Sequence, residues 1–156
     1  MTEKTQINIP AATLAPIIEE QLREGKTVRF APKGRSMLPM IREGRDTVTL
    51  CAVDRPLKKY DIGFYRRRDG QYVLHRIVKA GESITCIGDG QYVYERGLSK
   101  DLFIGVVCEF SRDNKVYSTE CIGYKIYCRL WHLSRPVRYF VKRAFGKLGR
   151  ILKGKA

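Results

Sequence analysis

The sequence predicts a mainly β fold, a twisted and barrel-like antiparallel domain with a helix at each end of the chain. Strand-like segments recur at short spacing in the middle, an amphipathic stretch precedes them, and a basic amphipathic stretch follows. At 156 residues the chain is long enough to bury one hydrophobic core. We expect residues 1–28 to be a helical segment packed on a β-rich domain of residues 29–128, with a basic helix over 129–156.

The first expected helix runs from Ala11 to Glu24 and ends near Gly25. Its apolar residues recur at helical spacing on one face, and they are Leu14, Ile17, Ile18 and Leu22. We expect this helix to cap one end of the β domain, and recognition of an incoming peptide is the alternative. Nothing before Arg29 approaches the roughly 20 apolar residues that span a bilayer, so neither a signal peptide nor a membrane anchor is expected there.

Six segments in the middle of the chain have the composition of strands. They are Thr47–Val53, Asp61–Arg66, Gln71–Val78, Ser83–Ile87, Phe103–Phe110 and Lys115–Glu120. Asp69-Gly70, between the second and third segments, is a strong hairpin signal. A turn over Ser111–Asn114 joins the last pair. Many short strands with regular turns are typical of an all-β domain.

One serine stands in a tight turn, between Gly34 and Pro39. A serine needs a base within hydrogen-bond reach to act as a nucleophile. The chain has only two histidines, and His75 lies in a strand-like segment. Asp89 follows in a glycine turn, where it could receive the far ring N–H of that histidine. Ser36, His75 and Asp89 therefore form a candidate nucleophile, general base and orienting group.

Four ordered segments carry a resemblance to a known superfamily. They are Gly34-x-Ser36-Met37-x-Pro39, Tyr60-Asp61-Ile62-Gly63-Phe64, Leu74-His75-Arg76-Ile77-Val78 and Gly88-Asp89-Gly90. Together they resemble the boxes of the signal-peptidase-like serine peptidases (S24/S26 type), which include the LexA-type self-cleaving repressors. The resemblance covers about Ala31 to Val107. It implies a fold of coiled antiparallel sheets. Histidine in place of the commoner lysine base is similar to the endoplasmic-reticulum and SipW branch of signal peptidases.

The resemblance also implies roles for the site residues. Ser36 would attack a scissile carbonyl, His75 would carry the proton, and Asp89 would hold His75. The backbone N–H of Ser36, with Gly34 and Met37 beside it, would bind the oxyanion and the substrate. Gly34 stands where leader peptidases have a serine whose hydroxyl helps to hold the oxyanion, so backbone N–H groups would have to suffice. The membrane signal peptidases carry an N-terminal transmembrane anchor, and none is expected in this sequence. This is a second departure from the family pattern.

Each candidate also has a structural interpretation. Ser36 could be a plain turn serine, His75 a satisfied core histidine and Asp89 a turn residue. Lys58 or Lys59 would be the base if the boxes are misaligned. No metal ion or other cofactor is expected.

The cysteines are five in number and lack metal-binding CxxC spacing, and they are Cys51, Cys86, Cys108, Cys121 and Cys128. We expect them to be free thiols that behave as small apolar residues in a reducing cytoplasm. A cysteine nucleophile is not favoured. We expect the protein to be cytoplasmic. Peripheral attachment to the inner face of the membrane is compatible with this location.

Charge is concentrated at the end of the chain. The net charge is +14, yet from Cys121 onward there are ten basic residues and no Asp or Glu. Subtracting these ten charges leaves +4 for the first 120 residues. Apolar residues of this tail recur at steps of three and four, and they are Val137, Phe140, Val141, Ala144, Phe145, Leu148, Ile151 and Leu152. Ser134 and Pro136 suit the start of a helix there.

Three partners remain open for this helix. It could dock its apolar face on the domain, lie on an anionic membrane surface, or bind nucleic acid through its charge. Nucleic acid is the least favoured, because no helix-turn-helix or zinc pattern accompanies the charge. Docking and membrane binding could coexist.

The sequence therefore predicts a serine endopeptidase that cleaves a peptide or leader segment of a protein, held in extended form beside a strand. The alternative is a catalytically vestigial regulatory or adaptor domain that binds a membrane or partner through its basic helix. A self-processing repressor ranks last, because no DNA-binding domain is expected before Ser36 and no Ala-Gly cleavage pair is evident upstream of it.

Overall fold

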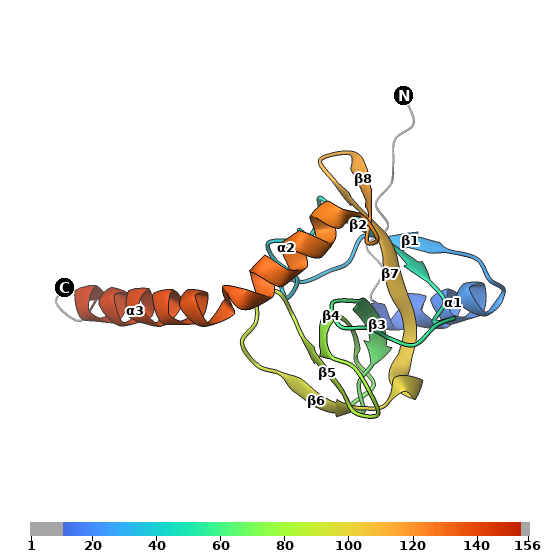
Figure 1. Cartoon of the computed structure of the whole chain (residues 1–156), viewed down its shortest axis with the longest axis horizontal. Helices are drawn as coiled ribbons and strands as arrows, with labels where there is room; N and C mark the ends of the chain where they lie inside the picture. Colours follow the sequence, from blue (N-terminus) through green and yellow to red (C-terminus); the bar gives the residue numbers. More distant parts are fainter. Residues whose placement is uncertain (1–10, 154–156) are drawn as a thin grey trace. The chain divides into compact units, whose positions relative to one another are not determined.

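The computed structural model describes the backbone of residues 11–153 and the side chains of residues 13–144. These residues form two compact units that divide between Glu120 and Cys121. The first unit holds α1 and the strands, and the second holds α2 and α3 (Figure 1). The described protein is mainly β, as predicted.

The elements of the first unit follow one another with short connections. They are α1 (Ala11–Arg23), β1 (Val28–Phe30), β2 (Thr47–Cys51), β3 (Ile62–Arg66), β4 (Tyr72–Lys79), β5 (Ile84–Ile87), β6 (Glu95–Leu98), a 3-10 turn (Lys100–Leu102), β7 (Phe103–Arg112) and β8 (Lys115–Ser118). The second unit consists of α2 (Ile122–Leu133) and α3 (Arg135–Lys153). All six strand-like segments of the sequence form strands within two residues of the expected ends.

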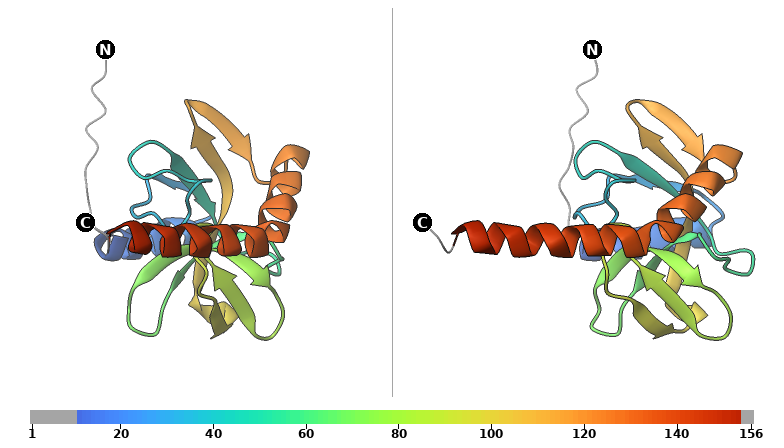
Figure 2. Two further views of the ribbon diagram at one scale, coloured as in Figure 1. Left: turned by 90° about the vertical axis from the view of Figure 1, so that its left-hand side faces the viewer. Right: turned by 60° about the vertical axis from the view of Figure 1, so that its left-hand side comes forward.

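The strands make one antiparallel sheet in the order β1-β2-β7-β3-β4-β5-β6, and β8 pairs with β7. The long strand β7 holds the sheet together, since its first part pairs with β3 and its later part pairs with β2 and β8. Figure 2 shows how the sheet bends around β7. The expected barrel-like closure is wrong: β1 and β6, at the two ends of the order, are not paired with each other.

Two hairpins form where the sequence places them. Arg67 N–H donates to Gln71 O at 2.7 Å across the β3–β4 turn, and Gly70 there has a φ of +86°. Asp113 and Asn114, between β7 and β8, both have positive φ values of 49° and 64°. Two consecutive positive φ angles match the twist of the flanking strands, which explains the short polar connection.

Three elements were not expected from the sequence. The strands β1 and β6 have three and four residues, and β6 is half exposed, so neither gives a strong alternating pattern. The helix α2 contains Gly123 and aromatic residues that also suit strands. Its first turn is closed by Cys121, whose sulfur accepts a hydrogen bond from Tyr124 N.

A compact apolar cluster lies between the strands of the first unit. Its buried members are Tyr65, Ile77, Ile84, Cys86 and Phe103. Gly63 is required here, because a Cβ atom at that position would lie 2.5 Å from the Phe103 ring.

Helix α1 packs against β7, β1 and β4. It buries Ala15, Ile18 and Leu22, and a Cβ atom at Gly105 would lie 2.8 Å from the Leu22 side chain. Ile17, which the helical spacing assigned to the apolar face, is 56% exposed. The buried face is therefore narrower than predicted, because three residues already fill the contact with the sheet.

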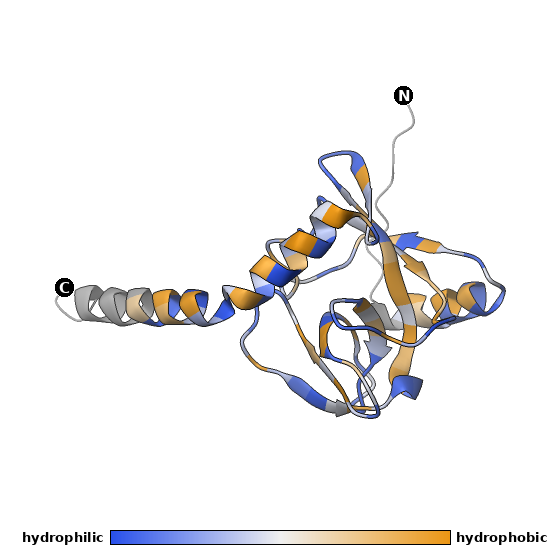
Figure 3. Cartoon of the chain, in the orientation of Figure 1, coloured by the Kyte–Doolittle hydropathy of each residue, from blue (hydrophilic) through white to orange (hydrophobic). Residues whose placement is uncertain are grey.

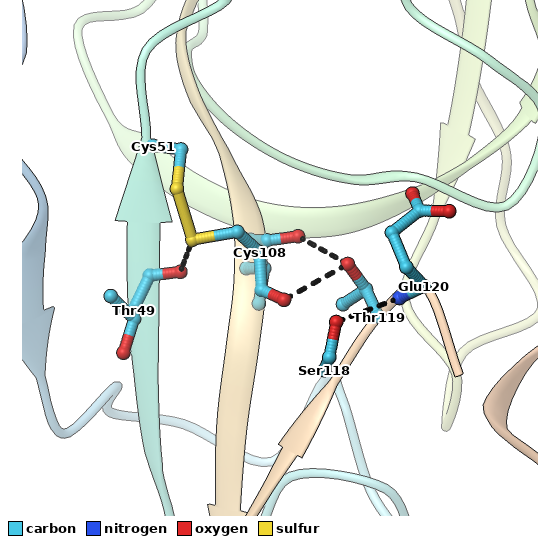
Figure 4. The surroundings of a disulfide bond; sticks show 7 residues. Thr49, Cys51, Cys108, Ser118, Thr119 and Glu120 are labelled. Carbon is cyan, nitrogen blue, oxygen red and sulfur yellow. Dashed lines mark hydrogen bonds between the residues drawn. A yellow bond between two sulfur atoms is a disulfide. The ribbon is translucent and has the colours of Figure 1, made fainter.

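The expectation of five free thiols is wrong for two of them. Cys51 on β2 and Cys108 on β7 form a disulfide between neighbouring strands (Figure 4). Their Cα atoms are 5.9 Å apart, within the range that a disulfide spans. Beside the bond, Thr119 Oγ1 donates to the carbonyl oxygens of Val107 and Cys108. Cys86, Cys121 and Cys128 are not part of a disulfide in the structure.

The described part of the second unit consists of two helices separated at Ser134. Among residues 11–153, no helix is both long enough and apolar enough to cross a membrane. The apolar residues of α2 and the start of α3 are visible in Figure 3 as bands between charged residues. The side chains of Phe145, Leu148, Ile151 and Leu152, which the sequence assigns to the apolar face, lie outside the described side chains.

Candidate active site

The Ser36 turn is built by its own backbone. Leu38 N donates to Arg35 O at 3.3 Å, and Ile41 N donates to Met37 O at 3.0 Å. Gly34 has a φ of +94°, a conformation that glycine adopts without strain. Met37 is buried and anchors the turn, while Ser36 is only partly buried. The turn therefore fixes the serine and leaves it accessible.

The Gly88-Asp89-Gly90 turn lies directly against the Ser36 turn. Gly90 N donates to Ser36 O at 2.8 Å. A Cβ atom at Gly88 would lie 2.5 Å from Ser36 O, and one at Gly90 would lie 3.1 Å from Leu38 O. Gly88 is needed because the two backbones approach this closely, whereas a side chain at Gly90 would require the neighbouring backbone to shift by a few tenths of an ångström. The first and last boxes of the sequence thus meet in space.

A cavity of about 120 Å³ opens beside Ser36. Apolar and aromatic side chains dominate its lining, including Leu14, Ile18, Phe30, Phe64, Tyr72 and Leu74. The strand residues Tyr72, Val73 and Leu74 immediately precede His75 on β4. A concave apolar site with few polar groups is typical of ligand binding.

The Asp89 carboxylate binds the residue after His75. Arg76 Nε and Nη2 donate to its two oxygens, each at 2.7 Å. Arg76 is 1% exposed and Asp89 is fully buried. Arg76 Nη1 also donates to Tyr60 O at 3.1 Å. This bidentate pair joins the Gly88–Gly90 turn to β4 and so helps to place the Ser36 turn.

His75 faces a different carboxylate. Its Nδ1 lies 2.9 Å from Glu95 Oε1 and 3.3 Å from the Tyr65 hydroxyl oxygen. Burial lowers the pKa of His75 below its ordinary 6.5, and this effect outweighs the opposing charge of Glu95. The distance to Glu95 would also suit an ion pair. Because the pKa of His75 is lowered, we assign a neutral imidazole instead. A carboxylate only accepts, so Nδ1 carries the proton and Nε2 keeps its lone pair.

Glu95 stands at the start of β6 and is not among the site residues that the sequence predicts. Burial raises the pKa of Glu95, but hydrogen bonds from Arg67 and Tyr65 outweigh this effect and leave the pKa lowered. Arg67 Nε donates to Glu95 Oε2 at 2.9 Å. Glu95 is therefore ionised when it faces His75. Its sequence signal is weak: it is the next acidic residue after Asp89, in a short exposed segment.

Ser36 and His75 are not hydrogen bonded to each other within the described part of the chain. The contacts of His75 with Tyr65 and Glu95 both involve Nδ1, which leaves Nε2 for another partner. Side chains alternate along a strand, and Leu74 lines the cavity while His75 meets Tyr65 and Glu95. Ser36 therefore shares its cavity with the residues just before His75, while His75 itself contacts Tyr65 and Glu95.

A metal site is not evident in the described part of the chain. Among those residues, no group of three or more His, Cys, Asp and Glu side chains is placed to hold an ion. No model of a known protein family matches this chain, and no curated protein matches it in sequence.

Proposed function

We propose that this protein is a serine endopeptidase of the signal-peptidase-like superfamily, with Ser36 as nucleophile and His75 as general base. The observation that supports it best is the state of His75. It is buried and neutral, and a carboxylate at Nδ1 leaves Nε2 able to accept a proton. In this proposal Glu95 takes the orienting role that the sequence assigns to Asp89.

The substrate would lie as an extended peptide along an open edge of β4. In the described pairings, β5 joins β4 only from Arg76 onward, because β5 ends at Ile87 and the chain turns away at Gly88. The edge from Tyr72 to His75 therefore lacks a partner strand on that side. Extended peptides bind such edges through backbone hydrogen bonds, with side chains placed in pockets. The cavity beside Ser36 supplies a pocket for an apolar side chain.

The proposed chemistry requires Ser36 Oγ to come within hydrogen-bond distance of His75 Nε2 when the substrate is bound. Ser36 Oγ attacks the scissile carbonyl as its proton moves to His75 Nε2, and the oxyanion forms beside the Ser36 backbone N–H. His75 then gives this proton to the leaving amine as the C–N bond breaks, which leaves an acyl-enzyme. Water attacks the ester with His75 again as base, and the proton returns to Ser36 Oγ. Glu95 holds Nδ1–H and stabilises the imidazolium in both steps.

A fluorophosphonate probe tests the nucleophile without knowledge of the substrate. We expect it to label the full-length protein at Ser36, to fail with Ser36→Ala, and to react slowly with His75→Ala. Ser99→Ala and His132→Ala serve as matched controls and should label normally. Equal labelling of Ser36→Ala and the native protein would contradict the proposal. Leader-type peptides, cleaved by the native protein and not by Ser36→Ala, would extend the test to the reaction.

A second candidate follows from the missing hydrogen bond between Ser36 and His75. In a catalytically vestigial adaptor domain the same turns would support a binding surface, and the nucleophile would not need to meet its base. This candidate predicts neither probe labelling nor peptide cleavage by a folded native protein. Labelling at Ser36 that depends on His75 would exclude it.

A further inference from the structure

The helical unit exposes a continuous series of large apolar side chains. They are Ile122, Ile126, Leu130, Leu133, Val137, Phe140 and Val141, with exposed fractions from 49% to 77%. Most are three or four residues apart, so they fall on one side of each helix. In Figure 3, apolar residues give orange bands along the ribbon of α2 and the first turns of α3.

This exposure differs from the behaviour of helix α1. That helix buries Ala15, Ile18 and Leu22 against the sheet. Single exposed apolar residues need no explanation, but a series of this length on one unit marks an interaction surface. The surface needs an occupant that removes leucine, isoleucine and phenylalanine side chains from water.

The charge of the same unit restricts that occupant. Ten basic residues and no acidic ones lie between Cys121 and the end of the chain. A second copy of the unit would bring ten positive charges against ten others, which opposes association. Nucleic acid would use the charge but leave the apolar side chains in water. An anionic lipid surface accepts both, since acyl chains take the apolar residues and headgroups take the basic ones.

The junction of the two helices suits the same environment. Arg138 lies over the Trp131 ring, with its guanidinium carbon 3.4 Å from the ring centroid, and donates to Trp131 O. Tyr127 also stacks with the Trp131 ring, at 6.0 Å between ring centroids. An open, mainly apolar hollow is lined by Tyr127, Leu130, Trp131 and Val137. Amphipathic aromatic rings with a cation beside them are enriched at the boundary between headgroups and acyl chains.

We propose that α2 and α3 form a binding site for the surface of an anionic phospholipid bilayer. The two helices lie in the plane of the interface, with the series from Ile122 to Val141 inserted among the acyl chains and the basic residues among the headgroups. The proposal does not depend on catalysis by Ser36 and stands or falls separately from the proposed function.

The chain contains a single tryptophan, Trp131, which makes the test direct. Full-length protein is mixed with vesicles of phosphatidylcholine alone or with phosphatidylglycerol added, and emission of Trp131 and co-sedimentation are recorded. We expect a blue shift, protection from acrylamide quenching and co-sedimentation with the anionic vesicles only. Added salt should weaken binding, because it screens the basic residues from the headgroups.

Paired variants separate the two contributions. Leu133→Ser with Phe140→Ser should lower the vesicle affinity on the order of tenfold for each residue. Arg129→Gln with Arg143→Gln should lower it about fivefold for each residue. The matched controls are Val116→Ser, which removes a 52% exposed side chain of β8, and Lys115→Gln beside it. Both controls should bind as the native protein does.

Several outcomes would overturn the proposal. No binding to either vesicle, or binding that the helical variants leave unchanged, shows that this surface does not meet lipid. Light scattering measures the oligomeric state. If the native protein is a dimer that does not bind vesicles, and Leu133→Ser with Phe140→Ser abolishes the dimer, the surface binds a second copy of the chain. Binding of duplex DNA without vesicle binding assigns it to nucleic acid. Circular dichroism on each variant confirms that the helices remain.

Discussion

His75 and Arg76 are consecutive residues of β4, and each meets a carboxylate from a different segment of the chain. Arg76 makes two hydrogen bonds with the buried Asp89, both at 2.7 Å. His75 places one ring nitrogen 2.9 Å from the partly exposed Glu95 and keeps the other nitrogen for a further partner. In the first pair, both carboxylate oxygens of Asp89 accept hydrogen bonds from Arg76. In the second pair, the contact with Glu95 occupies only Nδ1 of His75, so Nε2 can still accept a proton.

If the proposed function holds, this difference assigns a structural role to the Arg76–Asp89 pair and a catalytic role to the His75–Glu95 pair. A permanently charged guanidinium with a bidentate partner is suited to fixing two segments of backbone. A neutral imidazole with a lowered pKa can gain and lose a proton near neutral pH. Asp89 would therefore matter chiefly for stability, and Glu95 chiefly for activity.

The largest expected effect comes from breaking the Arg76–Asp89 pair. Asp89→Asn should lower the free energy of unfolding by about 3–5 kcal/mol, because it leaves the buried Arg76 charge without its partner. Urea unfolding measures this difference. Asp101→Asn, at an exposed position, should change it by less than about 0.5 kcal/mol. A small loss for Asp89→Asn would show that the pair does not hold the two turns together.

A double variant sharpens that result. Arg76→Met with Asp89→Leu should be less destabilising than either single substitution, because no uncompensated charge is then buried. The same urea experiment measures the coupling between the two positions. Additive losses would contradict a direct interaction.

The next effect concerns Glu95. Glu95→Gln should lower kcat/KM about a hundredfold, or about 2.7 kcal/mol, because His75 loses the carboxylate that holds its tautomer. The charge of Glu95 raises the pKa of His75, so the acid limb of the pH–rate profile should also move to lower pH. Activity at several pH values measures both changes, with the exposed Glu82→Gln as control. If folded Asp89→Asn loses more activity per molecule than Glu95→Gln, the assignment of roles is reversed.

A smaller effect should appear in the pH dependence of stability. Burial lowers the pKa of His75 below the 6.5 of an exposed histidine, so the unfolded chain binds more protons in this window. The contribution of His75 to stability is present above pH 6.5 and is lost as the pH falls toward the folded-state pKa. Urea unfolding of the native protein and of His75→Gln should therefore converge at low pH. Parallel curves would show that His75 does not titrate differently on folding.

The smallest expected effect comes from Tyr65→Phe. The Tyr65 hydroxyl is buried and lies 3.3 Å from His75 Nδ1. The substitution removes this contact and the hydrogen bond from the Tyr65 hydroxyl to the ionised Glu95, and should cost about 1.5 kcal/mol of unfolding free energy while the ring packing is kept. A much larger loss in urea would make the hydroxyl part of the orienting network rather than a minor support.

Much of the first unit could be predicted from local sequence. Strand-like composition and Asp69-Gly70 indicated β3 and β4, since side chains alternate along a strand and glycine permits the turn. The boxes around Ser36 and Gly88–Gly90 were expected to belong to one site, and the structure places their backbones in contact. The role of Ser36 in catalysis remains a proposal.

The sequence by itself determined the strand segments, the basic helical tail and the candidate residues, because these depend on local periodicity and composition. Only the tertiary structure decided the partners of those residues. Pairing of Cys86 with Glu95 across β5 and β6 brings Glu95 to His75, twenty residues before it, and pairing of β2 with β7 joins Cys51 to Cys108. Such contacts follow from the register of strands that are distant in sequence, and a local pattern carries no information about that register.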